Sequence, residues 1–171
     1  ESRRFAQRIT ETAPNIIYIH DLQKGGNIYI NHNVAALLGY SPQEIADMGA
    51  SLLAEIMHPA DAATFPHHLA QIISAADGLD FAFEYRMRDK RGAWHWFLSR
   101  DTVFQRDAVG NVTQFLGIAT DITELKAAQE AIRNSEARYR LLADNITDWV
   151  TRTNTLGEYI YVSPSVHTML G

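Results

Sequence analysis

Three histidines and one aspartate between positions 58 and 68 are the side chains best suited to bind a metal ion or to move protons. They are His58, Asp61, His67 and His68. Adjacent histidines on a helix point about 100° apart, whereas Asp61 and His68 are spaced so that they can share a face. The run His58-Pro59-Ala60-Asp61 is also typical of a helix start. A metal-dependent enzyme that uses His58, Asp61 and His68 is therefore an alternative, although three convergent ligands are not evident.

Other signatures of catalysis are missing from the sequence. It contains no nucleophile elbow, no phosphate-binding glycine loop and no HExxH pair. The absence of cysteine excludes disulfides, thiolate metal ligands and cysteinyl adducts. The formal net charge is -5 and no basic stripe stands out, which argues against a nucleic-acid partner. We therefore expect that this chain is not itself an enzyme.

Length and composition predict a folded chain. Of its 171 residues, 46% are apolar and 20% are charged, which suits one domain plus a fragment of another. No apolar run reaches the roughly 18 residues that a transmembrane helix needs, so no membrane contact is expected. We expect a cytoplasmic segment cut from a longer protein, which can itself be tethered to a membrane.

The chain is expected to open with a helix and a hairpin. Phe5 and Ile9 have helical spacing, which predicts a flanking helix over residues 1–13. Two strands follow, at residues 16–19 and 27–30, and a glycine turn joins them.

Short helices are expected between this hairpin and the rest of the sheet. Asn33 and Ser41 are good caps for the first two. A longer helix should run from His58 toward Ala76, and Pro66 should lie in its first turn or mark a kink.

Three further strands are predicted from alternating side chains. They cover residues 81–88, 94–99 and 112–118. Each of the two connecting turns, Asp89–Gly92 and Asp107–Gly110, has aspartate first and glycine fourth, which is typical of a type I turn. The pattern predicts an antiparallel meander.

The last strand runs directly into a helix. Asp121 can cap this helix, which is expected over residues 124–144. Leu125, Ile132 and Tyr139 lie on an apolar stripe of less than three heptads, which indicates a weak coiled coil.

The start of the chain recurs after this helix. Tyr159-Ile160-Tyr161-Val162 matches Asn27-Ile28-Tyr29-Ile30, and Met169-Leu170-Gly171 matches Leu37-Leu38-Gly39. We therefore expect a second, truncated copy of the domain over residues 136–171.

Short motifs in a fixed order carry a family signature. They are His58-Pro59-Ala60-Asp61, Phe83-Glu84-Tyr85-Arg86, Gly92 with Trp94 and Trp96, and the run from Gly117 to Glu124. Together they resemble a bacterial PAS domain with its C-terminal PAC motif. The resemblance implies an α+β fold with a five-stranded antiparallel sheet in the order 2-1-5-4-3 and helices on one face. The complete domain would occupy residues 14–123, ahead of the connecting helix.

The resemblance also implies a sensory role. Such domains belong to multidomain signalling proteins, either sensor histidine kinases of two-component systems or diguanylate cyclases and phosphodiesterases. We expect this one to sense a small ligand or cofactor, or to relay a conformational change to a downstream domain of the same chain. Asp121, Ile122 and Thr123 are the predicted relay. Homodimerisation is expected through the flanking helices, at Phe5, Ile9, Leu125, Ile132 and Tyr139.

A pocket is expected between the sheet and the long helix. The predicted inward-facing residues that would line it are Met57, Phe65, His68, Phe83, Tyr85 and Trp96. Tyr85 and His68 are its obvious polar groups. The alternative is that these side chains only fill the core.

The cofactor, if there is one, stays unknown at this point. In the haem-binding members that the sequence resembles, the proximal histidine would fall at Phe65, with His67 and His68 out of register, so haem is not expected. A flavin bound through cysteine is excluded because the chain has no cysteine. A non-covalent flavin flanked by Trp94 and Trp96 remains open.

Overall fold

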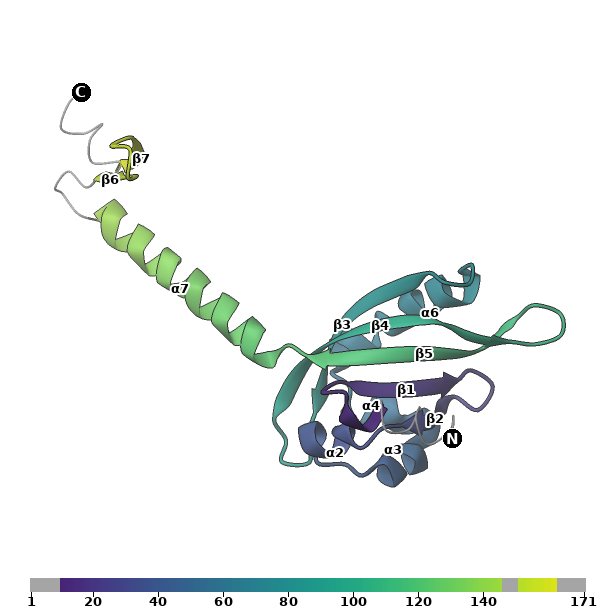
Figure 1. Ribbon diagram of the computed structural model, residues 1–171. Helices are drawn as coiled ribbons and strands as arrows, with labels where there is room; N and C mark the ends of the chain where they lie inside the picture. The colour runs from purple at the N-terminus through teal and green to yellow at the C-terminus, as the bar shows by residue number, and fades with distance from the viewer. Residues whose placement is uncertain (1–9, 146–150, 163–171) are drawn as a thin grey trace. The chain divides into compact units, whose positions relative to one another are not determined.

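The computed structural model describes residues 10–145 and 151–162, which belong to two units, residues 1–124 and 125–171. The first unit contains a five-stranded antiparallel sheet in the order β2-β1-β5-β4-β3 (Figure 1). Its strands are β1 (Ile16–Asp21), β2 (Gly26–Ile30), β3 (Asp80–Arg88), β4 (Trp94–Arg106) and β5 (Val112–Asp121). The predicted fold class and strand order are confirmed.

Short helices connect β2 to β3 and cover one face of this sheet (Figure 1). They are α2 (Asn33–Leu38), α3 (Pro42–Met48), the 3-10 turn η1 (Gly49–Ser51), α4 (Leu52–Ile56), α5 (Pro59–Ala62) and α6 (Phe65–Ser74). The single helix expected from His58 toward Ala76 is therefore two helices. Pro66 lies in the first turn of α6, where a missing N–H costs no hydrogen bond.

Of the two helix caps predicted at Ser41 and Asn33, the first is confirmed and the second is wrong. Ser41 forms a capping box with Glu44, since each side chain bonds the backbone N–H of the other. Asn33 does not cap α2, because the helix begins at Asn33 itself and the cap position falls on His32. The amide N–H₂ of Asn33 donates to the carbonyls of Ala13 and Asn15. It thereby ties the segment ahead of β1 to the start of α2.

The connecting helix α7 spans Thr123–Asn145, close to the predicted range. In the second unit β6 (Thr151–Thr153) pairs with β7 (Tyr159–Val162), where the repeat predicted a hairpin. Residues 146–150 and 163–171 of that repeat lie outside the described residues, as do Phe5 and Ile9. Of the flanking helix expected over residues 1–13, residues 10–13 are described; residues 10–12 are helical and residue 13 is a bend. The division into domains stays a prediction.

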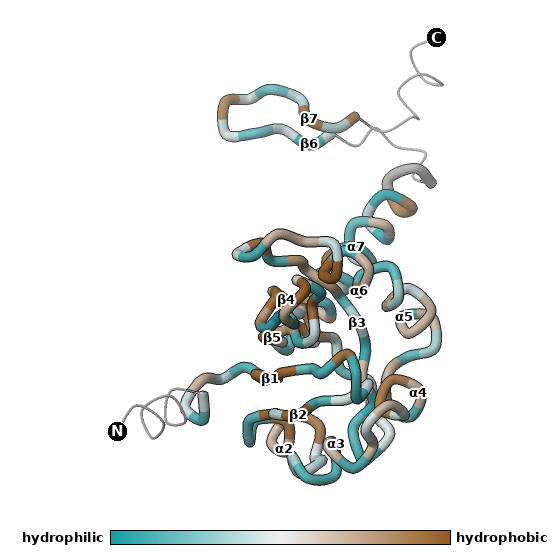
Figure 2. The backbone as a smooth tube through the Cα atoms, turned by 90° about the vertical axis from the view of Figure 1, so that its right-hand side faces the viewer, coloured by the Kyte–Doolittle hydropathy of each residue, from teal (hydrophilic) through white to brown (hydrophobic). Residues whose placement is uncertain are grey.

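The core lies between the sheet and its helices. Figure 2 shows apolar stretches, in brown, along β1, β4 and α4. On β3 and β4, Tyr85 pairs with Phe97, and both are buried, with Phe97 fully enclosed. Trp96 pairs with Arg86 and lies on the opposite face, where the guanidinium carbon of Arg86 is 4.8 Å from the centroid of its ring. The prediction that Trp96 faces inward is therefore wrong.

A hydrogen bond across three strands fixes the middle of the sheet. Gly117 on β5 lies between Tyr18 on β1 and Asp101 on β4. The Tyr18 hydroxyl passes over Gly117 and donates to Asp101 Oδ1 at 2.6 Å. A Cβ atom on Gly117 would overlap the Tyr18 ring and the Asp101 carboxylate. Close approach, rather than backbone conformation, therefore requires glycine at this position.

Gly117→Ala should lower the free energy of unfolding by about 3 kcal/mol or more. Overpacking costs about 1–3 kcal/mol, and a buried carboxylate that loses a donor costs a similar amount. Urea denaturation of the two proteins measures the difference. Gly78→Ala is the control, because its Cβ meets nothing within 4 Å and only the strain of a φ of 83° remains. Equal losses in the two variants would contradict the cross-strand bridge.

Trp96→Ala and Phe97→Ala should differ in cost although the residues are adjacent. Phe97 is fully enclosed, so its removal should cost about 3–5 kcal/mol. Trp96 is half-buried, so its loss should cost about 1–2 kcal/mol from packing and the contact with Arg86. The same denaturation experiment compares them, and a larger loss for Trp96→Ala would reverse the assignment of faces.

Candidate functional site: a buried cavity and its polar wall

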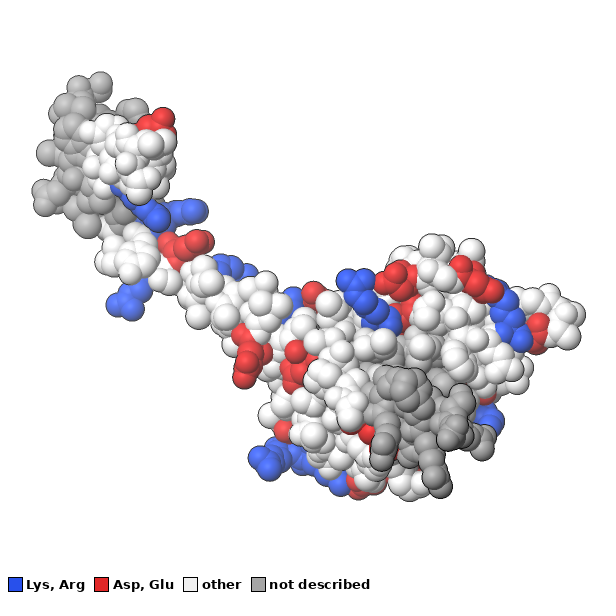
Figure 3. All heavy atoms as spheres, viewed as in Figure 1, with Lys and Arg blue, Asp and Glu red and all other residues white. Residues whose placement is uncertain are grey.

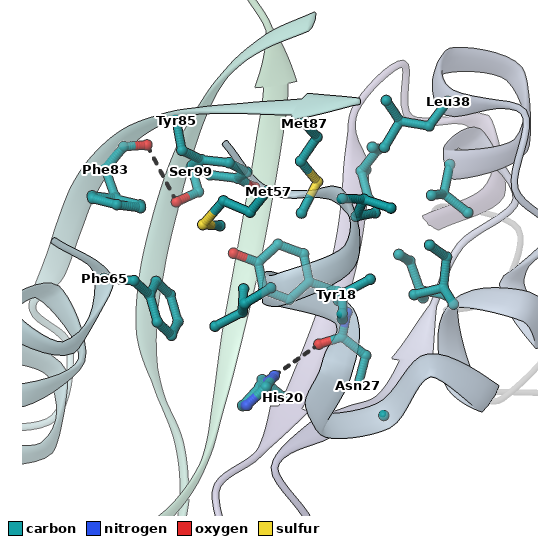
Figure 4. A pocket seen from close by; sticks show the side chains of 18 of the residues that line it. Tyr18, His20, Asn27, Leu38, Met57, Phe65, Phe83, Tyr85, Met87 and Ser99 are labelled. Atoms are coloured by element: carbon teal, nitrogen blue, oxygen red, sulfur yellow. Dashed lines mark hydrogen bonds between the residues drawn. The ribbon is translucent and has the colours of Figure 1, made fainter. Parts of the chain in front are cut away.

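A cavity of about 60 Å³ lies between the sheet and the helices α2, α3, α4 and α6 (Figure 4). Most of its wall is apolar and comes from β1, β2, α2–α4 and β3. These apolar residues include Ile16, Ile30, Val34, Leu38, Ile45, Leu52, Ile56, Met57 and Met87. The polar residues on the wall are Tyr18, His20, Asn27, Tyr85 and Ser99. The cavity thus has an apolar body and one polar side.

Four of the predicted pocket residues line this cavity: Met57, Phe65, Phe83 and Tyr85. His68 is not on the wall but lies behind it on α6, where it is 3% exposed. Trp96 is absent from the wall, as its position on the other face of β4 requires.

Sequence reasoning missed several polar wall residues. Tyr18 and His20 share the inner face of β1 with Ile16, so the alternation of that strand could have found them. Ser99 follows Phe97 on the inner face of β4. The more apolar side chains of Trp94, Trp96 and Leu98 favour the opposite face of β4 as the inner one.

The polar side of the cavity is organised by the buried carboxylate of Asp101. Its Oδ1 accepts from the Tyr18 hydroxyl. Its Oδ2 accepts from Ser99 Oγ at 2.7 Å and lies 2.8 Å from His68 Nε2. Asp101 and Ser99 are each 1% exposed. A carboxylate removed from water is tolerated because these partners satisfy it.

Burial shifts the pKa values of the surrounding groups. It raises the pKa of the Tyr18 phenol well above its ordinary value, and the charges of Tyr85 and Asp101 raise it further. Burial likewise raises the pKa of Tyr85, with an added contribution from Asp101. The pKa of His20 is lowered, also mainly by burial. All three groups are therefore neutral near pH 7, and both phenols keep their protons.

Aromatic rings form a stack beside this network. His68 stacks on Phe83 at 4.8 Å between centroids, Phe83 on Tyr85 at 5.4 Å, and Tyr85 on Phe97 at 6.0 Å. Offset stacking of this kind adds to the apolar packing. The stack links α6 to β3 and β4, and two of its members, Phe83 and Tyr85, line the cavity.

The proposed metal ligands have separate partners. His58 Nδ1 accepts from the Ala60 N–H at the start of α5. Asp61 binds Arg86 through both carboxylate oxygens and also accepts its backbone N–H. His68 is paired with Asp101. Among residues 10–145 and 151–162 no group of three or more metal-ligating side chains converges, so nothing in the described chain supports the metal-enzyme alternative.

The size of the cavity limits what can enter it. Sites for drug-sized ligands and cofactors measure about 300–1,000 Å³. The cavity of about 60 Å³ is several times smaller than that, and Trp96 is not beside it. A flavin or a haem would therefore fit only if core side chains moved.

The predicted relay residues meet the sheet at one point. Asp121 Oδ1 accepts from the backbone N–H of Thr123 at 2.8 Å and from its hydroxyl at 2.5 Å. The Thr123 hydroxyl in turn accepts from the backbone N–H of Trp96 at 2.9 Å. The backbone N–H of Ile122 donates to the Trp96 carbonyl at 2.8 Å. Asp121 ends β5 and lies just before α7, so its carboxylate organises the first residue of the helix. The start of α7 is thus bonded to the backbone of β4.

The charged surface shows no concentrated patch on the face that Figure 3 presents, where basic and acidic side chains are interspersed. Within the two described stretches, none of the helices has the apolar length that a bilayer crossing needs.

Comparisons with known proteins agree with this architecture. Residues 27–119, more than half of the chain, match the family model described as "PAS fold". An uncharacterized protein, y4lL, of Sinorhizobium fredii is 31% identical over 123 residues, which is 71% of this chain and 14% of the relative. The two-component sensor PprA of Pseudomonas aeruginosa is 28% identical over 139 residues, which is 80% of this chain and 14% of that protein. The chain thus spans about one seventh of the length of these relatives.

A solved structure shows the same fold. The sensory box histidine kinase/response regulator of Burkholderia thailandensis superimposes with a TM-score of 0.59 at 23% identity. The match covers 82% of this chain and 98% of that one. Together with the strand order and the family model, these findings show that the chain belongs to the PAS family.

Proposed function

We propose that this chain senses a small ligand in its cavity and passes the resulting change through residues 121–123 into α7. The observation that carries the proposal is that the cavity and the start of α7 share β4 and β5. Phe115 on β5 and Ser99 on β4 line the cavity. Farther along the same two strands, Asp121 and the Trp96 backbone hold the first residues of α7.

The hydrogen bonds of the cavity wall support this route. Asp101, which orders the polar side of the cavity, is opposite Gly117 on β5. A ligand that changes the Tyr18–Asp101 contact therefore acts on the central strands of the sheet. Strands are stiff and tightly paired, so a small displacement there reaches their ends. The output domain of the parent protein would be a histidine kinase, in line with the relatives. The displacement of the strands would shift the equilibrium of that domain between its two states.

The surface of α7 supports pairing of two chains. Leu125, Ile132 and Tyr139 are 55%, 61% and 71% exposed, at the spacing of a heptad stripe. Burying one such side chain contributes about 1.5–3 kcal/mol, so a second copy of the helix would bury several at once. We propose a parallel homodimer through this stripe, in which a shift at residues 121–123 becomes a change in the packing of the helices.

Thr123→Val should uncouple the cavity from α7. The change keeps the shape of the side chain and removes the hydroxyl that joins Asp121 to the Trp96 N–H. We expect a loss of about 1 kcal/mol, with faster amide exchange in the first turn of α7. Hydrogen exchange followed by mass spectrometry measures this. In the full-length parent, output at equal protein level should change with Thr123→Val and not with Thr102→Val, which removes a hydroxyl of β4 that bonds the Leu79 carbonyl instead of α7. Unchanged output in both would contradict the relay.

Ile132→Asp should shift the chain toward monomer without unfolding the PAS domain. A charge in the paired stripe would lose apolar burial and would place two like charges opposite each other. Analytical ultracentrifugation at high micromolar concentration measures the effect. Asn134→Asp adds the same charge at a position off the stripe and should leave the dimer intact. A wild-type monomer, or a dimer indifferent to Ile132→Asp, would contradict the proposed pairing.

A further inference from the structure

The hydrogen bonds of the cavity wall have a direction that limits the ligand. Asp101, as a carboxylate, can only accept. The Tyr18 hydroxyl, 2.6 Å away, therefore gives its proton to Asp101. The Ser99 hydroxyl gives its proton to Asp101 at 2.7 Å rather than to the Phe83 carbonyl at 3.5 Å, which is the longer of its two contacts. Each of these groups has one proton, so toward the cavity each has only oxygen lone pairs to offer.

His20 adds a further acceptor to this wall. His20 Nδ1 lies 3.0 Å from the amide oxygen of Asn27, which can only accept, so His20 carries its proton on Nδ1. Because burial lowers the pKa of His20, the ring is neutral and its Nε2 is an acceptor. The amide N–H₂ of Asn27 is the donor that this wall retains.

We propose that the cavity binds a small neutral alcohol, whose hydroxyl donates to the acceptors of this wall and whose short carbon chain lies against Ile56 and Met57. This inference rests on the proposed ligand-sensing function and names the class of ligand. An alcohol also has a lone pair for the Asn27 amide, so it satisfies both kinds of group. Every buried polar group then keeps a partner, which burial requires.

The dimensions of the cavity set the size of the ligand. An engineered cavity of about 150 Å³ binds benzene. A cavity of about 60 Å³ therefore takes a molecule of only a few non-hydrogen atoms. Ligands this small bind weakly, and we expect a dissociation constant on the order of 10 mM.

Other ligand classes fit this wall less well. A ketone, an ether or a carboxylate would bring acceptors to groups that are themselves acceptors, which leaves buried lone pairs facing each other. An ammonium ion would need an uncommitted carboxylate to offset its desolvation. Among the described residues that line the cavity there is no carboxylate, and the oxygens of Asp101 behind it are already hydrogen-bonded.

Two nearly isosteric probes test the direction of the hydrogen bond. 2-Propanol can donate, whereas acetone has the same number of non-hydrogen atoms and can only accept. Each is titrated into the 171-residue chain while the methyl resonance of Met57 is followed by NMR. We expect saturable shifts with both and about threefold to tenfold tighter binding of 2-propanol. Acetone binding as tightly as 2-propanol, or more tightly, would overturn the alcohol proposal.

Xenon under pressure separates this proposal from the function on which it rests. Xenon needs no hydrogen bond and reports only whether the cavity exists and can be reached. If xenon shifts Met57 and 2-propanol does not, the ligand class is wrong and the sensing cavity stands. If none of the three probes shifts Met57, the proposed ligand-sensing function is overturned together with the alcohol.

Asp101→Asn tests the origin of the acceptor wall. The new amide N–H₂ can donate to Tyr18 or Ser99 and so release one hydroxyl proton toward the cavity. The preference for 2-propanol over acetone should then fall to about one or reverse. Asp107→Asn makes the same change at a carboxylate in the β4–β5 turn and should keep the wild-type preference. A folded Asp101→Asn protein with an unchanged preference would overturn the proposal, and the wild-type comparison decides it if this variant does not fold.

Discussion

The buried carboxylate of Asp101 is the constraint on which the rest of the domain depends. A carboxylate away from water is tolerated only when hydrogen bonds satisfy it, and here the partners are Tyr18, Ser99 and His68. They come from β1, β4 and α6, so one group fixes the register of the central strands and holds a helix against them. The missing side chain of Gly117 makes room for the contact. The close packing over Gly117 and the hydrogen bonding of Asp101 therefore depend on each other.

The same network explains why the cavity and the start of α7 can communicate. β4 brings Ser99 to the cavity wall and the Trp96 backbone to the Thr123 hydroxyl. β5 brings Phe115 to the cavity wall and ends at Asp121. Both routes pass within a few residues of Asp101, so a change in the hydrogen bonds of the wall acts on the two strands that hold the helix. A purely apolar cavity of this size would have no such connection to the sheet.

Much of the fold could be predicted from the sequence because its signals are local. Alternation along the strands, the aspartate and glycine of each tight turn, and the Ser41 capping box depend only on neighbouring residues. The family motifs then supplied the strand order, which local signals cannot. Where a partner is distant, local reasoning failed. The cap predicted at Asn33 falls one residue earlier, on His32, and the Asn33 amide instead holds carbonyls of the segment ahead of β1. The helix expected after His58 divides in two before Pro66, which opens α6.

The candidate site was predictable only in its apolar half. Phe83 and Tyr85 alternate with charged residues, so their strand has one evident inner face. On β4 the more apolar face is the outer one, because it carries Trp96, whereas the inner face carries Ser99 and Asp101. Hydrophobicity alone therefore assigns that strand the wrong way round. What decides its orientation is that Tyr18 and His68, 83 and 33 residues away in the chain, supply partners for Asp101. A polar inner face is stable only because several distant elements satisfy it together, and no pattern within one strand records that.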